Sequence, residues 1–247
     1  MLKNQFRHFL PVLCLLCVLS AVPASGAAIQ YTDATSWSNA TTGITAVPFT
    51  GIAPAGGSVT YNNSTGLVVN GVQFLGFLSP TSYQLSVVDS QFASPYWNFG
   101  SPNVQSPVYD RAQSATYLPH IRVELPAGTT AFSTTLSTVS PNALTYSVQL
   151  ADGTTFVVST ANRPTTSFIG VTSAASIGYV DFTVLGTAYN GGTYGLMQSF
   201  QIGTASATPS VSPGQVPEAA TTIMIGLGLL LLRSVKKTPK LFQLVHA

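Results

Sequence analysis

The sequence predicts an all-β protein whose central domain is a β-sandwich of jelly-roll type. Three observations lead to this fold class: apolar residues of the central region recur with a period of two, Gly, Pro and Asn interrupt them at short intervals, and no 3.6-residue period persists. About ten short strands of this kind suit two packed sheets, in which each strand turns one face to the core. A closed barrel is the alternative, and an outer-membrane barrel is disfavoured because its strands would be longer.

The chain begins with a predicted secretory signal peptide, residues 1–28. A basic start is followed by the apolar run Phe9–Leu19 and by small residues at 24–28, which offer the cleavage site. The apolar run is too short to span a bilayer, which needs about 20 residues. Both cysteines, Cys14 and Cys17, lie inside this run. The mature protein would therefore have neither a disulfide nor a zinc–sulfur site.

The strands of the central domain, residues 29–203, are predicted from alternation of apolar and polar residues. The alternation is clearest over 121–125, 144–150 and 180–184. Uncharged Thr and Ser residues occupy many of the polar positions, and such short side chains suit the solvent-facing side of a strand. Each of these segments is therefore expected to lie on the core with one face.

Turn residues predict where the strands reverse. Asn70-Gly71, Asp152-Gly153 and Asn190-Gly191-Gly192 each separate two strand-like segments, so a hairpin is expected at each of them. The third turn would join a strand over 178–185 to a strand over 194–202.

Charge is scarce in the central region. Between residues 28 and 215 there is no lysine, and three arginines are outnumbered by six carboxylates, a net charge of −3. The basic residues at the two ends of the chain raise the overall pI to 8.6. A nucleic-acid-binding surface needs clustered Lys and Arg against phosphates, so no nucleic-acid partner is expected.

The central domain offers few groups for acid–base catalysis. Its one histidine, His120, precedes a predicted strand and is interpreted as a surface or capping residue. Asp110 and Glu124 could in principle form the carboxylate pair of a glycoside hydrolase, but no spacing selects them. The sequence has no Gly-x-Ser-x-Gly elbow and no His-x-x-x-His metal pair. We expect no enzyme activity and no cofactor, with a structural calcium ion as an open alternative.

The segment predicted to contact a ligand is 92–120, which combines aromatic residues with Pro, Ser and Asn. Carbohydrates are bound by aromatic faces together with Asp, Asn and Arg side chains that hydrogen-bond the hydroxyls, in a site with apolar walls and a few polar groups. The candidate ligand-binding residues are Tyr96, Trp97, Tyr109, Asp110 and Arg111. The competing interpretation, in which these rings cap one end of the core, is the commoner role of large rings.

The C-terminal part of the chain is predicted to reach a membrane. Residues 204–215 have the composition of an extended linker. The apolar segment 219–232 follows, and at 1.5 Å rise its 14 residues span about 21 Å, just enough to cross a thinned bilayer. Basic residues after this segment place the tail, residues 238–247, in the cytoplasm.

Residues 216–237 resemble the PEP-CTERM sorting signal, which combines a Pro-Glu motif, an apolar helix and a basic cluster. The matching residues are Val216, Pro217, Glu218, Arg233, Lys236 and Lys237. Ala219 stands where the family usually has a second proline, and the tail is longer than usual. The resemblance implies a Gram-negative bacterium, transit through the inner membrane and processing by the membrane protease exosortase. A plain single-pass anchor is the alternative interpretation.

Residues 118–203 also resemble the ectodomains that commonly carry this signal. The similar segments are Leu125–Thr129, Asp152-Gly153 and Phe168–Ser173. Such ectodomains often have Asp-Asn before the last strand, where this chain has Met197-Gln198-Ser199.

The expected function follows from the two end signals around a β domain without cysteine or lysine. We expect an exported structural or adhesive protein of the cell surface or extracellular matrix, with extracellular polysaccharide as a candidate partner. The alternative is an exported hydrolase acting on glycans, built on the same scaffold.

Overall fold

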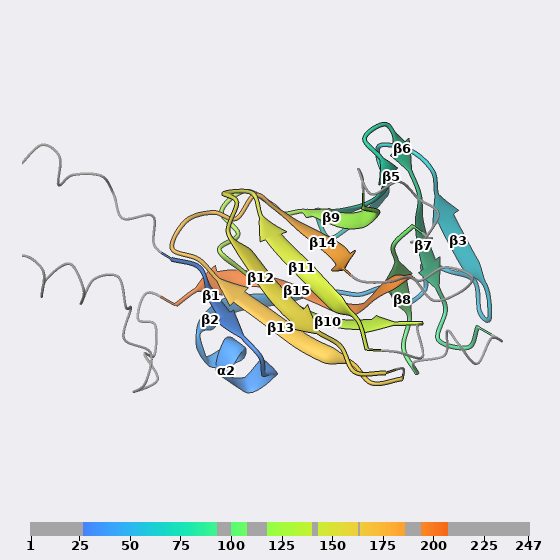
Figure 1. Cartoon of the computed structure of the whole chain (residues 1–247). Coiled ribbons are helices and arrows are strands. Elements are labelled where there is room, and N and C mark those ends of the chain that lie inside the picture. The colour runs from blue at the N-terminus through green and yellow to red at the C-terminus, as the bar shows by residue number, and fades with distance from the viewer. Residues whose placement is uncertain are drawn as a thin grey trace, which may run out of the picture. The chain divides into compact units, whose positions relative to one another are not determined.

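The computed structural model describes residues 27–92, 100–107, 118–139, 143–162, 164–185 and 194–206. In these residues the protein is all-β, with two antiparallel sheets and one short helix (Figure 1). The chain divides into two compact units, Met1–Thr208 and Pro209–Ala247, and every described residue belongs to the first. No helix among the described residues is long and apolar enough to cross a membrane. Residues 1–26 of the predicted signal sequence, the sorting signal and the tail lie outside the described residues.

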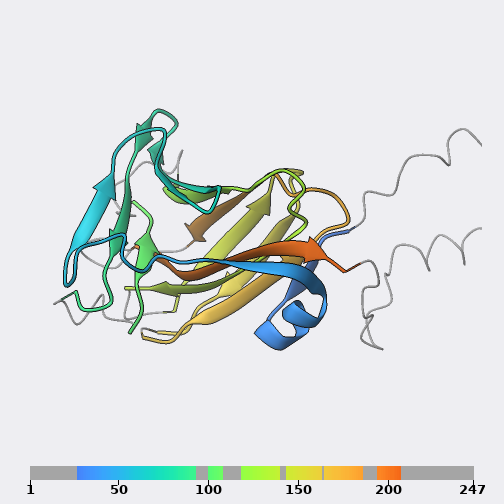
Figure 2. The same ribbon diagram turned by 180° about the vertical axis from the view of Figure 1, so that it is seen from behind.

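The first sheet, sheet A, has the strand order β1-β13-β10-β15-β8-β7-β3. The long strand β15 pairs with β10 along one side, and with β8 near its start and β2 near its end on the other side. Figure 2 shows β2, in blue, running beside the orange β15. The strands of sheet A are β1 (Ile29–Tyr31), β2 (Thr41–Val47), β3 (Ser58–Tyr61), β7 (Leu85–Val88), β8 (Asn103–Gln105), β10 (Ala131–Thr138), β13 (Ser167–Thr172) and β15 (Gly195–Ala205).

The second sheet, sheet B, has the order β12-β11-β14-β9-β5-β4, and the short strand β6 pairs with β5. Its strands are β4 (Leu67–Val69), β5 (Val72–Ser79), β6 (Ser82–Tyr83), β9 (His120–Glu124), β11 (Thr145–Leu150), β12 (Thr155–Ser159) and β14 (Tyr179–Leu185).

Eight strands have the connectivity of a jelly roll. Apart from the β11–β12 hairpin, the chain changes sheet after every strand from β9 onward. The resulting neighbours are β2-β15-β10-β13 in sheet A and β9-β14-β11-β12 in sheet B, the order produced by two Greek keys. The predicted β-sandwich is confirmed, and its strand order agrees with the jelly-roll type. Strands β3 to β8 form an insertion between β2 and β9 that extends both sheets.

Aromatic contacts join the two sheets through the core. Phe132 of β10 lies edge-on to Phe182 of β14, with ring centroids 6.0 Å apart, and Phe200 of β15 lies edge-on to Phe74 of β5 at 5.4 Å. Phe132 and Phe200 also stack on each other within sheet A. All four rings are at most 1% exposed, so their burial holds the layers together.

Two of the three predicted hairpins are confirmed. Asn70 and Gly71 have φ angles of 50° and 79°, the left-handed conformation that a type I′ turn requires at both central positions. The turn at Asp152-Gly153 joins β11 to β12. The hairpin expected at Asn190-Gly191-Gly192 is wrong, because β14 belongs to sheet B and β15 to sheet A. Turn residues mark the end of a strand but do not specify which sheet receives the next one.

A short helix, α2 (Ala34–Asn39), covers part of the outer face of sheet A. Asp33 caps it by accepting a hydrogen bond of 2.8 Å from the Ser36 backbone N–H. Trp37 is 1% exposed, and its indole N–H donates to the Val171 carbonyl at 3.3 Å. A Cβ on Gly170 of β13 would lie 2.4 Å from the Trp37 ring, so the ring packs directly on backbone.

The last strand extends beyond the predicted domain boundary. β15 continues to Ala205, and the Ser206 backbone N–H donates to the Ala40 carbonyl at 2.9 Å. Residues 27–208 therefore contain both described sheets and their hydrophobic core, and they form the fragment to use when the domain is studied alone.

Candidate functional site

The candidate site lies on the outer face of sheet B. On β9 the side chains of Ile121 and Val123 are buried in the core, so the alternating residues His120, Arg122 and Glu124 face outward. Neighbouring strands bring further side chains beside them. We call the group the sheet-B cluster, and it consists of Phe77, Tyr83, His120, Arg122, Tyr179 and Asp181.

The centre of the cluster is an ion pair between neighbouring strands. The register places Arg122 of β9 opposite Asp181 of β14. The Arg122 Nε donates to Asp181 Oδ1 and its Nη2 donates to Oδ2, both at 2.8 Å. This bidentate geometry is the strong form of a charge-assisted hydrogen bond. Hydrogen bonding to Asp181 is the main cause that raises the pKa of Arg122, and partial burial opposes it.

Two aromatic rings flank the guanidinium. The Arg122 Cζ lies 4.1 Å from the ring centroid of Tyr179 and 5.5 Å from that of Phe77, both within cation–π range. Phe77 stacks on His120 with centroids 5.0 Å apart and an interplanar angle of 13°, and Tyr83 lies 5.0 Å from Phe77. The side chains therefore form a continuous row across β6, β5, β9 and β14, in which the Arg122 guanidinium lies between the rings of Phe77 and Tyr179.

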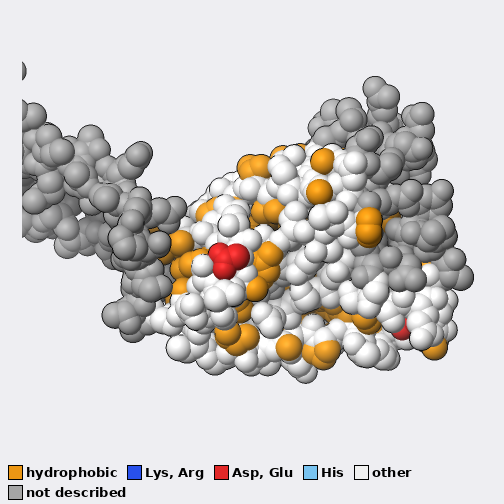
Figure 3. Space-filling model, turned by 90° about the horizontal axis from the view of Figure 1, so that it is seen from below, with side chains coloured by type: hydrophobic (Ala, Val, Ile, Leu, Met, Phe, Trp, Pro, Cys, Tyr) orange, Lys and Arg blue, Asp and Glu red, His pale blue; other side chains and the backbone are white. Residues whose placement is uncertain are grey.

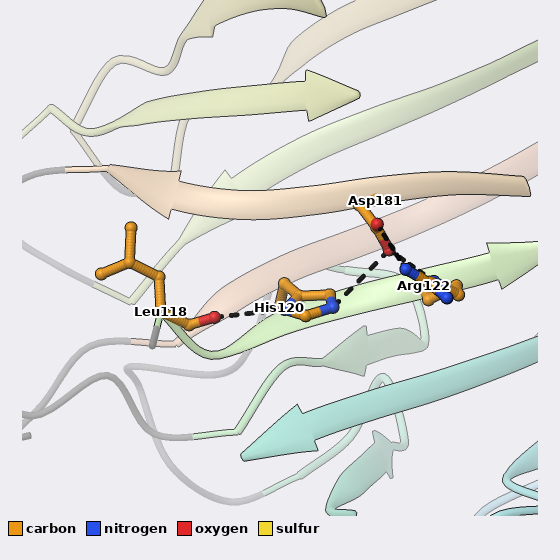
Figure 4. A network of polar contacts seen from close by, with 4 residues as sticks. All are labelled: Leu118, His120, Arg122 and Asp181. Carbon is orange, nitrogen blue, oxygen red and sulfur yellow. Dashed lines mark hydrogen bonds and ion pairs between the residues drawn. The ribbon is translucent and has the colours of Figure 1, made fainter. Parts of the chain in front are cut away.

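Figure 4 shows two polar contacts of His120. Its Nδ1 lies 3.1 Å from the Leu118 carbonyl oxygen and its Nε2 lies 3.6 Å from Asp181 Oδ1. A carbonyl can only accept, so Nδ1 carries the proton that it donates to Leu118. The sequence interpretation of His120 as a capping residue fits the Leu118 contact, but it missed the contacts with Phe77 and Asp181. These partners are distant in sequence, so no local signal could have indicated them.

Polar groups surround the rings on the same face. Thr183 lies opposite His120, and Gln149 of β11 lies opposite Asp181. The Arg122 and Asp181 side chains are 29% and 13% exposed. A ligand on this face would meet ring surface beside hydrogen-bond donors and acceptors that are already held in place.

Asp181, the carboxylate at the centre of the cluster, is not placed to act as a general acid. Both oxygens of Asp181 accept hydrogen bonds from Arg122, so neither is placed to protonate a leaving group. Glu124 faces outward on β9, but Asp110, the other carboxylate considered, lies outside the described residues. In the part of the chain that the structure describes, no three His, Cys, Asp or Glu side chains lie close enough to hold a metal ion.

The other residues singled out from the sequence lie outside the described part of the chain. They are Tyr96, Trp97, Tyr109, Asp110 and Arg111 of the ligand-binding segment, and Val216, Pro217, Glu218, Arg233, Lys236 and Lys237 of the sorting motif. Among the described residues of the segment 92–120, His120 joins the sheet-B cluster.

The scarcity of charge is visible on the surface. Arg122 is the one Lys or Arg side chain within the described ranges. In the view of Figure 3 the described surface is mainly uncharged, with hydrophobic side chains scattered over it, two acidic spots and no basic side chain.

Comparison with known proteins gives no family. No protein-family model and no curated protein matches this sequence. Among solved structures, an arginine-to-alanine variant of the family 29 carbohydrate-binding module CBM29-2 is 13% identical, with a TM-score of 0.32 over 63% of this chain and 99% of that one. The module TmCBM61 in complex with β-1,4-galactotriose is 12% identical, with a TM-score of 0.25 over 63% and 89% of the two chains.

An adhesin domain of Lys-gingipain from Porphyromonas gingivalis is also similar, at 12% identity and a TM-score of 0.27 over 73% of this chain and 100% of that one. At these identities and TM-scores the likenesses carry no argument about a binding site.

Proposed function

We propose that this protein is exported to the cell envelope and that its sandwich domain binds polysaccharide through the sheet-B cluster. One observation carries the proposal: Arg122 lies between Tyr179 and Phe77 and is ion-paired with Asp181 on a partly exposed sheet face. Sugars present C–H surfaces and hydroxyl groups side by side. This face likewise presents aromatic rings beside polar groups that are already hydrogen-bonded.

Preorganisation favours binding here. A flexible arginine or tyrosine loses conformational freedom when it is immobilised by a ligand, at a cost of about 0.5–1.5 kcal/mol for each side chain. Stacking and ion pairing already restrict these side chains in the free protein. Less of the favourable interaction energy with a sugar would therefore be lost to ordering these side chains.

The proposed location rests on the two ends of the chain. The signal sequence supports export, and the resemblance of residues 216–237 to a sorting signal supports processing by an exosortase-type protease at the inner membrane. The product would be a structural or adhesive protein of the cell surface or the extracellular matrix.

The binding proposal is tested by affinity electrophoresis of residues 27–208 in gels that contain soluble polysaccharides. We expect at least one polysaccharide to retard the wild-type domain, and we expect Tyr179→Ala and Tyr83→Ala to reduce the retardation. Tyr31→Ala is the matched control, because Tyr31 lies on β1 of sheet A. Circular dichroism confirms that each variant is folded.

If both cluster variants bind as the wild type does, the binding site lies elsewhere. Release of reducing ends by the wild-type domain would instead indicate the alternative function, a hydrolase acting on glycans.

A further inference from the structure

We infer that the ligand of the sheet-B cluster is an uncharged polysaccharide and that acidic polysaccharides are excluded. This inference rests on the proposed function and names its ligand class. It follows from the ion pair that Arg122, the one described Lys or Arg side chain, forms with Asp181, and from the negative net charge of the central region.

The Nε–Nη2 edge of the guanidinium is already used. Arginine recognises carboxylate or sulfate groups with two parallel N–H donors. In Arg122 two such donors, on Nε and Nη2, bind the two oxygens of Asp181. To bind at this edge, a uronic acid or sulfated sugar would have to displace Asp181. Displacement would leave the Asp181 carboxylate, which is 13% exposed, without its counter-charge, and this loss would offset part of the gain from the new ion pair.

The remaining charged groups on the face repel anions. Arg122, Asp181 and Glu124 are the charged residues that face outward on β9 and β14. Together these three groups have a net charge of −1. Asp152 adds a further negative charge in the turn between β11 and β12 of the same sheet.

The wider domain adds to this local effect. Residues 28–215 contain no lysine and carry a net charge of −3. A polyanion approaching such a domain is repelled at long range, whereas a neutral polymer is not. The hydroxyl groups of a neutral sugar can still hydrogen-bond to the Tyr83 and Tyr179 hydroxyls and to Gln149. They can also accept from the Arg122 N–H groups that do not bind Asp181.

The inference is tested with polymers that share a backbone and differ in charge. Affinity electrophoresis of residues 27–208 compares hydroxyethylcellulose with carboxymethylcellulose, and galactan with polygalacturonate. Among the polymers that bind, we expect the neutral member of each pair to bind at least about tenfold more tightly at low salt. Added salt should leave the binding of the neutral member nearly unchanged.

Two variants that each remove one negative charge separate the effect of the Arg122–Asp181 pair from the effect of net charge. Asp181→Asn frees the Nε–Nη2 edge of Arg122, whereas Asp152→Asn removes a charge from the turn. We expect Asp181→Asn to bind the acidic polymers at least about fivefold more tightly than Asp152→Asn does. Salt dependence of the wild-type protein provides a readout that does not depend on the folding of either variant.

Each outcome has a distinct meaning. Tighter binding of the acidic members by the wild-type domain would overturn this inference and leave the proposed function standing. Equal binding of acidic polymers by the two variants would overturn the argument from the Arg122–Asp181 pair. Absence of binding to any polysaccharide would overturn the proposed function itself.

Discussion

Tyr146 shows how a single hydroxyl group ties the two sheets together. It lies on β11 of sheet B, and its hydroxyl group donates to the Ser137 carbonyl and accepts from the Leu196 backbone N–H at 2.9 Å, both in sheet A. The side chain is 2% exposed. Burial raises the pKa of Tyr146 well above its ordinary value of 10.0, and the hydrogen bond from Leu196 opposes this only in part.

Tyr146→Phe should destabilise the domain by about 1–3 kcal/mol, because it leaves a buried N–H and a buried carbonyl without their partner. Urea denaturation of residues 27–208 measures this change. Tyr61→Phe is the control, since the structure shows no hydrogen bond from the Tyr61 hydroxyl to another described residue. If the two variants are equally stable, the hydroxyl group of Tyr146 does not stabilise the contact between the sheets.

The same residue predicts a loss of stability in alkali. The folded protein keeps Tyr146 neutral, so its contribution is fully present below pH 10.0, the ordinary pKa, and is lost as the pH rises and the unfolded chain releases the proton. Between pH 10 and pH 11 the wild-type domain should therefore lose about 1 kcal/mol more than Tyr146→Phe. Urea denaturation at the two pH values checks this, and equal losses would contradict it.

At the scale of elements, the packing of helix α2 on sheet A requires a glycine, Gly170, in β13. Gly170→Ala would place a methyl group 2.4 Å from the Trp37 ring, so the helix must shift. We expect destabilisation by about 1–3 kcal/mol and a red-shifted Trp37 emission, because overpacking displaces the ring toward water. Trp97, the other tryptophan, is replaced by Phe to isolate the signal. Thr166→Ala, an exposed position just before β13, should change neither readout.

Strands β9 and β14 should be coupled through their outward side chains. A double-mutant cycle with Arg122→Ala and Asp181→Ala is expected to give a coupling energy of about 0.5–1 kcal/mol, because the pair is well aligned but partly exposed. High salt should reduce the coupling only in part. A coupling energy of zero would show that the pair does not stabilise the fold.

The sequence predicted the elements better than it predicted the site. Strands β9 and β14 were recognisable because one face of each strand is buried and the other is partly exposed to solvent, so apolar and polar residues alternate. Strand β10 was not, because nearly all of its side chains are buried on both faces. The Arg122–Asp181 pair joins residues 59 apart, so its existence depends on sheet register, which no local pattern encodes.

At the scale of the whole domain, both ends of the described chain lie at one end of the sandwich. Ile29 pairs with Thr172, Thr172 with Ala131, and Ala131 with Gly203, so β1 and the end of β15 are three strand spacings, about 14 Å, apart. Figure 1 shows β6, which carries Tyr83, at the opposite end of the domain. The sheet-B cluster thus extends away from the point where the chain continues toward the predicted membrane segment.

The last prediction concerns that membrane segment. If an exosortase reads Val216-Pro217-Glu218, the apolar segment 219–232 must hold the motif at the outer face of the inner membrane. Leu227→Arg places a charge near its centre at a cost of about 2.5–3.5 kcal/mol, so precursor should escape from the membrane unprocessed. Glu218→Ala should leave the segment inserted but the motif unread, so precursor should accumulate in the membrane.

Immunoblots of fractionated cells distinguish these outcomes with one antibody against the sandwich domain and one against Phe242–Ala247. Ser212→Ala, in the predicted linker, is the control and should be processed as the wild type is. Under the sorting hypothesis the wild-type protein loses the C-terminal epitope when it leaves the membrane, because cleavage separates the domain from its tail. A plain anchor predicts that the epitope stays with the domain in every fraction and that Glu218→Ala has no effect on its size. That result would exclude processing and leave a permanently anchored protein, whose polysaccharide binding would then act at the membrane surface.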